Sequence, residues 1–156
     1  MASPFAAAIT KQTLGPGDGV STIFGPLNST FAPSYAASAD NVMVLVENVM
    51  QISTTNFGIS QNPSATGSGA EINATALSSA NNGTDYVITS VGSTAFTSFG
   101  AGANTVGTVF TKSGATPTGT GKVRVAGYYL TFTSAIPNTG GGGNPVYVTV
   151  YYGYAN

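Results

Sequence analysis

Side chains able to do acid–base, nucleophilic or metal-binding chemistry are scarce in this sequence. Its 156 residues include four Lys or Arg, five Asp or Glu, and no His or Cys, so charged residues make up 6% of the chain. An ordinary globular domain has roughly 25%. General acid–base catalysis, covalent catalysis through Cys or His, and Cys-ligated zinc sites need groups that this chain lacks or has in very small number. The composition therefore argues against an enzyme, and we expect no catalytic residues, no cofactor and no metal site.

The charged residues that are present do not form a familiar catalytic motif. No Ser-x-x-Lys dyad occurs, so we expect the lysines, Lys112 among them, to be solvated. Two carboxylates on one wall of a cleft could hydrolyse a glycoside, but the acids, such as Asp18 and Glu47, fall in predicted turns and caps. The end of a phosphate-binding loop is suggested by Gly119 to Lys122, yet Thr116 and Val123 replace the glycine and the hydroxyl residue that this loop requires.

The same scarcity of charge limits the partners. Four basic residues and a net charge of −1 cannot neutralise a row of phosphates, so we expect no nucleic-acid binding. No apolar run approaches the ~20 residues of a membrane helix, so we expect no membrane association. Residues 1–15 lack the basic start of a signal peptide, and we interpret them as an N-terminal arm. A near-zero net charge gives little repulsion between molecules, which favours a protein packed into an assembly.

Residues two apart share a face of a strand, and this period is the dominant pattern of the chain. Near the C-terminus, Val146, Val148, Val150 and Tyr152 alternate with polar or aromatic residues, and we expect the valine face to be core. Residues 42–46 predict a strand with two apolar faces, followed by a hairpin turn at Glu47–Asn48. Residues 128–133 predict a third strand, with Leu130 and Phe132 on one face.

The middle of the chain is rich in Gly, Ser, Thr and Asn but contains short strand-like segments, such as residues 85–90 and 105–111. It is too apolar for a disordered linker. We therefore predict an all-β fold: an antiparallel β-sandwich built from residues 16–60 and 123–156, with residues 61–122 as a small inserted β module. Such an insertion is tolerated because the entropy cost of closing a loop grows slowly with its length.

The tyrosines are the best remaining functional candidates, because tyrosine offers a large contact area and a polar tip at interfaces. Since the valines of the last strand face the core, Tyr147 and Tyr151 should face outward. The predicted partner interface consists of these two tyrosines, Tyr154, and three apolar residues of the arm, Pro4, Phe5 and Ile9.

Two sets of segments resemble virion structural proteins of tailed bacteriophages. The first set is similar to a small β-domain of fibre and decoration proteins and comprises Gly17 to Val20, Asn41 to Gln51, Asn56 to Ser60, Tyr129 to Pro137 and Val146 to Tyr154. The second, within Asn82 to Gly121, resembles a module found in phage structural proteins, with GAGANTVG at residues 100–107 and GTG at residues 119–121. In this chain the glycine expected in the Val-rich hairpin is absent, and Glu47–Asn48 stands there.

The resemblance implies a non-enzymatic protein of the virion, assembled in the host cytoplasm. The first candidate is a capsid decoration (cement) protein that binds the major capsid protein of the outer shell. A short tail, collar or fibre-adaptor protein bound to tail proteins is the second candidate. A third candidate, from a different class of protein and independent of the resemblance, is a glycan-binding module that stacks sugars on exposed tyrosines. In both virion roles we expect a homo-oligomer, with a trimer as the first state to test.

Overall fold

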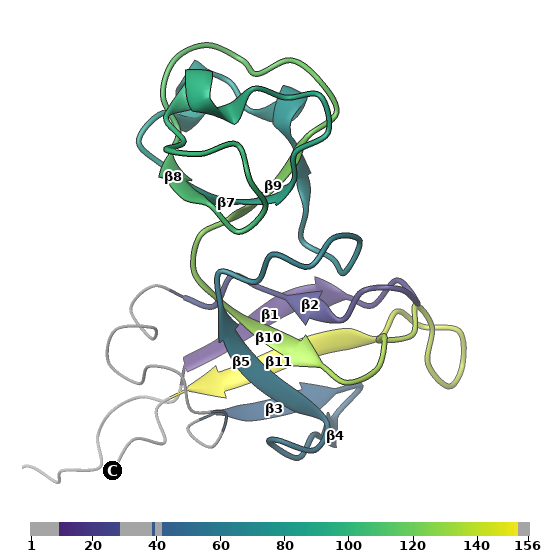
Figure 1. Ribbon diagram of the computed structural model, residues 1–156. Coiled ribbons are helices and arrows are strands. Elements are labelled where there is room, and N and C mark those ends of the chain that lie inside the picture. Colours follow the sequence, from purple (N-terminus) through teal and green to yellow (C-terminus); the bar gives the residue numbers. More distant parts are fainter. Residues whose placement is uncertain (1–9, 29–38, 40–41, 153–156) are drawn as a thin grey trace, which may run out of the picture.

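The computed structural model describes residues 10–28, 39 and 42–152. Within these residues the chain forms eleven strands in three antiparallel sheets, and its only helical segments are short 3₁₀ turns. Two sheets pack into a sandwich, and the third belongs to an insertion that projects from it (Figure 1). The predicted all-β sandwich is therefore confirmed. No helix within these residues is long and apolar enough to cross a membrane.

Sheet A contains four strands in the order β1-β11-β3-β4. They are β1 (Thr10–Pro16), β11 (Tyr147–Tyr152), β3 (Met43–Val46) and β4 (Val49–Met50). The alternation predicted for the last strand is confirmed, because Val148 and Val150 are fully buried whereas Tyr147 is 49% exposed. The hairpin between β3 and β4 is also confirmed, with Glu47 at φ 50° and Asn48 at φ 64°.

Sheet B contains three strands in the order β2-β10-β5, with bounds β2 (Ile23–Phe24), β10 (Tyr128–Phe132) and β5 (Phe57–Gln61). Its inner face packs against the valines of sheet A. Three phenylalanines dominate this contact: the ring of Phe132 lies 5.7 Å from Phe24 in an edge-to-face arrangement and 6.1 Å from Phe57. Such aromatic pairs add to the stabilisation that comes from burying apolar area.

The insertion has a sheet and a core of its own. Sheet C runs in the order β6-β9-β7-β8, with bounds β6 (Ile72–Asn73), β9 (Lys122–Val125), β7 (Asp85–Ser90) and β8 (Val109–Thr111). Three 3₁₀ turns complete it: η2 (Ala74–Ala76), η3 (Ser79–Asn81) and η4 (Phe96–Phe99). The fully buried ring of Phe96 and the ring of Phe110, 5.7 Å away, lie in this core.

The observed boundaries differ from the predicted ones at two places. Residues 10–15, assigned to the arm, form most of β1 and pair with β11. Residues 123–125, assigned to the sandwich, belong to β9 in the insertion, so the insertion extends from residue 62 to residue 127. The cause is that only two residues separate β9 from β10, and the apolar pattern runs through both strands without a clear break.

Candidate functional site

The structure divides the predicted interface residues into separate groups. Pro4, Phe5, Ile9 and Tyr154 lie outside the described residues. Tyr147 and Tyr151 both lie on β11 and face away from the sandwich core, which is the predicted orientation. They occupy opposite ends of that strand: Tyr151 pairs with Lys11 near the start of β1, and Tyr147 pairs with Pro16 at its end.

The two ends of the sandwich therefore differ in what they carry. At the Tyr151 end, Thr10 pairs with Tyr152, so the first described residue and the last lie side by side. The same end carries the connection to the insertion, because the Leu27 amide bonds to Tyr128 O at 2.8 Å and the Asn28 amide bonds to Tyr152 Oη at 3.5 Å. The Tyr147 end carries the β3–β4 hairpin and the loop of residues 133–146.

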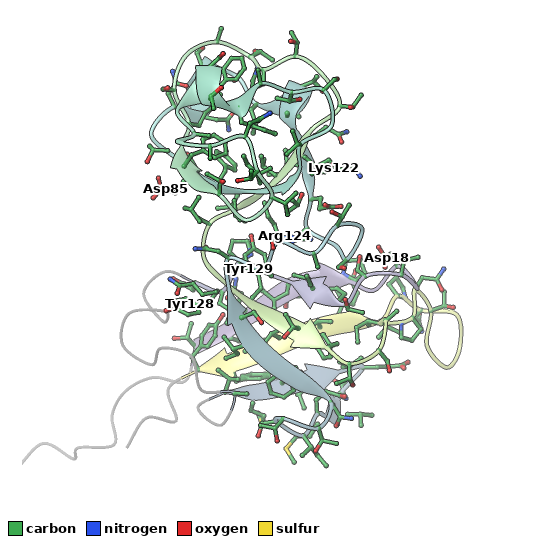
Figure 2. The ribbon with its side chains drawn as sticks, in the orientation of Figure 1. Asp18, Asp85, Lys122, Arg124, Tyr128 and Tyr129 are labelled. Carbon is green, nitrogen blue, oxygen red and sulfur yellow. The ribbon has the colours of Figure 1, made fainter. Side chains whose placement is uncertain are left out.

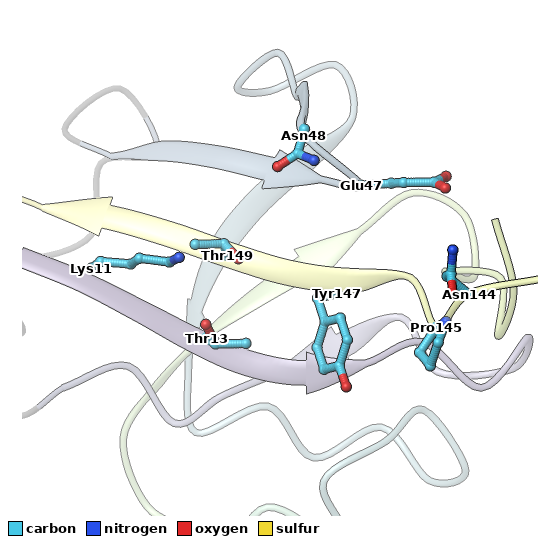
Figure 3. A pocket seen from close by; sticks show the side chains of 8 residues that line it. All are labelled: Lys11, Thr13, Glu47, Asn48, Asn144, Pro145, Tyr147 and Thr149. Atoms are coloured by element: carbon cyan, nitrogen blue, oxygen red, sulfur yellow. The ribbon is translucent and has the colours of Figure 1, made fainter. Parts of the chain in front are cut away.

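A groove of about 550 Å³ lies on the outer face of sheet A and includes Tyr147 (Figure 3). Strand β11 runs along its base and contributes Thr149 as well as Tyr147. Strand β1 supplies Lys11 and Thr13 on one side, and the β3–β4 hairpin supplies Glu47 and Asn48 on the other; Asn144 and Pro145 lie at its end. A volume of this size is typical of small-molecule sites, which span ~300–1,000 Å³.

The carboxylate of Glu47 is positioned by its own turn and by the neighbouring loop. Its backbone is in the left-handed region, and its amide bonds to Tyr147 O at 3.3 Å. A side chain at Gly140 would collide with the Glu47 carboxylate, so the carboxylate lies directly against the Gly140 backbone. Only glycine permits this close approach, and the carboxylate is consequently held at the Tyr147 end of the groove.

A second polar cluster joins the insertion to the sandwich, and Figure 2 shows Arg124 and Tyr129 at this junction. Arg124 is fully buried. Its Nε donates to Gly69 O and its Nη2 to Ala65 O, both at 2.9 Å, and its Nη1 donates to Pro63 O. The three carbonyls belong to the segment that leads from β5 into the insertion. Arg124 therefore binds that connecting segment to β9.

Electrostatics at this junction follow from burial. Desolvation lowers the pKa of Arg124, and the charge of Glu71 opposes that shift. Glu71 Oε2 accepts a hydrogen bond from the Gly67 amide at 2.9 Å and lies 3.8 Å from Lys122 Nζ. The Tyr129 hydroxyl donates to Val125 O at 2.7 Å, and burial raises the pKa of Tyr129 to about 12. All of these contacts stabilise the backbone of the junction.

Lys112 is buried as well, so the expectation that it is solvated is wrong. Its ammonium donates to Asn82 Oδ1 at 3.0 Å and to three consecutive carbonyl oxygens, those of Ser113, Gly114 and Ala115, at 2.9–3.0 Å. Its Nζ also lies 5.7 Å from the centroid of the Phe99 ring. A loop of carbonyls in this way replaces the water shell of the cation, which makes Lys112 a structural residue of the insertion.

Sequence reasoning missed two parts of this picture. Glu47 was interpreted as a turn residue, and its position in the groove was not predicted. The available signal was the Glu–Asn pair in a hairpin turn that favours Asn–Gly. Arg124 and Lys112 gave no signal, because their partners are backbone carbonyls. Among the described residues, no group of three or more Asp or Glu side chains is placed to hold a metal ion.

Comparison of the chain with protein-family models, with curated proteins and with solved structures finds no match.

Proposed function

We propose that the chain is a non-enzymatic structural protein of a bacteriophage particle, and that it decorates the outer capsid shell. The observation that carries the proposal is the placement of the two buried cations. The Arg124 and Lys112 side chains donate hydrogen bonds to backbone carbonyl oxygens of the chain itself, and Lys112 donates one more to Asn82. Neither side chain faces a cleft. In a chain with four basic residues, this use of charge favours rigidity over chemistry.

The architecture supports attachment through one end. Thr10 and Tyr152 lie side by side at the end of sheet A where Tyr151 faces outward. Residues 1–9 and 153–156, which hold Pro4, Phe5, Ile9 and Tyr154, continue from these two strands. Docking through Tyr151 and the two chain ends leaves the Tyr147 end directed away from the shell. The resemblance of both parts of the chain to phage virion proteins points in the same direction.

A tail, collar or fibre-adaptor role on the same particle is the second candidate. The observation that favours it is the projecting insertion, which presents its own surface. Arg124 holds the segment of residues 63–69 within it, and Ser68 O of that segment accepts from the Thr22 and Ile23 amides of the sandwich. Both roles use contact with other virion proteins, and both are compatible with a homo-oligomer such as a trimer. They differ in the number of copies on each particle.

The test is quantitative mass spectrometry of purified phage particles. Hundreds of copies per particle support a decoration protein, and a few copies support a tail component. Absence from the particle contradicts both roles. A docking assay then uses particles that lack the protein: the Tyr151→Ala variant should rebind more weakly than wild type, whereas Tyr147→Ala should rebind normally. Mass photometry of the purified chain gives its oligomeric state.

A further inference from the structure

The groove on the outer face of sheet A places one exposed aromatic ring among hydrogen-bonding side chains. Tyr147 is 49% exposed, and Thr149 lies two positions further along the same strand (Figure 3). The amides of Asn48 and Asn144 lie on the hairpin and on the loop. An aromatic face is partially negative and attracts the C–H groups of a sugar ring. Amides donate and accept, as sugar hydroxyls require.

The charges at the groove select a neutral ligand. Lys11 lies on the β1 side and Glu47 on the hairpin side, so the lining carries one charge of each sign. A polyanion would meet Glu47, and a polycation would meet Lys11. A neutral molecule with many hydroxyls can instead donate to the carboxylate and accept from the ammonium. Hydrogen bonds to charged groups of this kind are stronger than neutral ones.

The backbone at Glu47 gives a second, independent indication. Glu47 and Asn48 both have positive φ, in a two-residue turn that strongly prefers Asn–Gly. A glutamate in the left-handed region is strained, and strained residues concentrate at functional sites. Here the strained residue lines the groove, and its carboxylate lies at the groove's end against Gly140, which makes room for it. The turn retains Glu47 at a cost in stability, which is expected when the carboxylate contacts a ligand.

We propose that this groove binds neutral hexose saccharides. Tyr147 provides the stacking surface for one sugar ring, and Glu47, on the other side of β11, accepts hydrogen bonds from hydroxyls of a neighbouring sugar. Asn144 on the loop and Thr149 on β11 bind further hydroxyls. The site binds without cleaving, because Glu47 is the one carboxylate among the residues that line the groove, and glycoside hydrolysis uses two. The proposal goes beyond particle docking, since Tyr147 lines the groove whereas Tyr151, at the other end of β11, does not.

The backbone beneath the groove argues against a peptide as the ligand. Extended peptides commonly bind by adding a strand to a free sheet edge. Strand β11 is paired on both sides, with β1 and with β3, and offers no free edge. Tyr147 and Pro145 supply the apolar contacts of the groove, without the deep apolar pockets that anchor peptide side chains.

The experiment begins with the full chain on a glycan array, followed by calorimetric titration with cello-, malto- and manno-hexaose. We expect at least one neutral hexose series to bind. Tyr147→Ala should weaken binding about tenfold, which corresponds to the loss of one stacking contact. Glu47→Gln should weaken it by a similar factor. The matched control is Tyr151→Ala on the same face of the same strand, which does not line the groove and should bind as wild type does.

Gly140→Ala provides a further variant, because the added methyl displaces the Glu47 carboxylate while the rest of the groove is unchanged. This variant should bind saccharides more weakly. Its melting temperature should stay the same as that of the wild type, which shows that the fold is intact. The proposal is overturned if no neutral saccharide binds, if binding is unaffected by both Tyr147→Ala and Glu47→Gln, or if only peptides or charged polymers bind. Each of these results is separable from particle docking, which is measured with Tyr151→Ala.

Discussion

Gln61 and Tyr128 are cross-strand partners in sheet B, although the whole insertion lies between them in the chain. The next residues remain side by side, because the Asn62 amide bonds to Gly127 O at 2.8 Å and the Gly127 amide bonds to Asn62 Oδ1 at 2.7 Å. The insertion is therefore a greatly enlarged hairpin loop that leaves and re-enters the sandwich at one point. Only two adjacent chain segments, at residues 61–62 and 127–128, join the insertion to the sandwich. Such a narrow connection would bend easily, so side-chain contacts must stiffen it.

Replacement of Arg124 by Met tests that role. The variant keeps an apolar stem of similar length but leaves three carbonyl oxygens without their donor. We expect the free energy of unfolding to fall by about 3 kcal/mol or more, since each buried unsatisfied group costs ~1–3 kcal/mol. Urea denaturation measures the loss. Hydrogen exchange at the Ile23 amide, which bonds to Ser68 O at 2.8 Å, should also accelerate.

The control for Arg124→Met is Lys122→Met in the same strand. The Lys122 side chain is 41% exposed, and its Nζ lies 3.8 Å from Glu71 Oε2. The Glu71 side chain is 9% exposed, but the 3.8 Å separation is longer than a hydrogen bond, so Lys122→Met removes no bonded donor and should cost less stability than Arg124→Met. If Arg124→Met and Lys122→Met lower the free energy of unfolding by the same amount, the proposal that Arg124 stiffens the junction is contradicted.

Replacement of Lys112 by Met tests the second buried cation. Its ammonium bonds to Asn82 and to three carbonyls of residues 113–115, and all four acceptors lose their partner in the variant. We expect a loss of about 2–4 kcal/mol, measured by thermal or urea denaturation. The matched control is Lys11→Met, a substitution at an exposed lysine. A Lys112→Met protein as stable as the control would show that these bonds contribute nothing.

The strands of the sandwich were predictable because their side chains obey a strict period. Val148 and Val150 face the core and Tyr147 faces outward, as a period of two requires. The hairpin at Glu47 followed from apolar runs on both sides of two turn-compatible residues. Such patterns are local, and the sequence displays them directly.

The buried cations and the groove were not predictable, because they depend on contacts between distant segments. Arg124 is buried by a segment that lies 55 to 61 positions earlier in the chain. Tyr129 lies on the face opposite Leu130, and its side chain is buried because it lies at the junction with the insertion. The groove needs β1, the β3–β4 hairpin and Asn144 together. The sequence pattern does not show that these distant segments lie together in the fold.

Asp18 should give the protein a measurable dependence on acid pH. The Ser21 hydroxyl bonds to Oδ2 at 2.6 Å, and the amides of Ser21 and Val20 bond to Oδ1 at 2.6 and 2.9 Å. These bonds, the Ser21 hydroxyl first, lower the pKa of Asp18 from 3.8 to about 2. As pH falls, the unfolded chain therefore takes up the proton before the folded chain does. The stabilisation is complete above about pH 4 and is lost between about pH 4 and pH 2.

The measurement is urea denaturation across that pH range, with Asp18→Asn as the comparison. The amide does not titrate, so the difference in stability between wild type and variant should shrink as pH falls. Asp18 is exposed, and solvent reduces the size of the effect. If the difference in stability between wild type and Asp18→Asn is the same at pH 6 as at pH 2, the lowered pKa of Asp18 is contradicted.

Glu47 should show opposite effects on stability and on saccharide binding. Its φ of 50° is costly for glutamate and well tolerated by asparagine. Glu47→Asn should therefore raise the free energy of unfolding by roughly 0.5–1 kcal/mol, while it removes the carboxylate and weakens hexose binding. Glu47→Gln is the control, since it keeps the strained backbone and should leave stability unchanged while it weakens binding equally. Denaturation and calorimetry on the same preparations measure both quantities. If Glu47→Asn lowers stability, the turn is not strained, and if it retains full binding, the carboxylate has no part in the site.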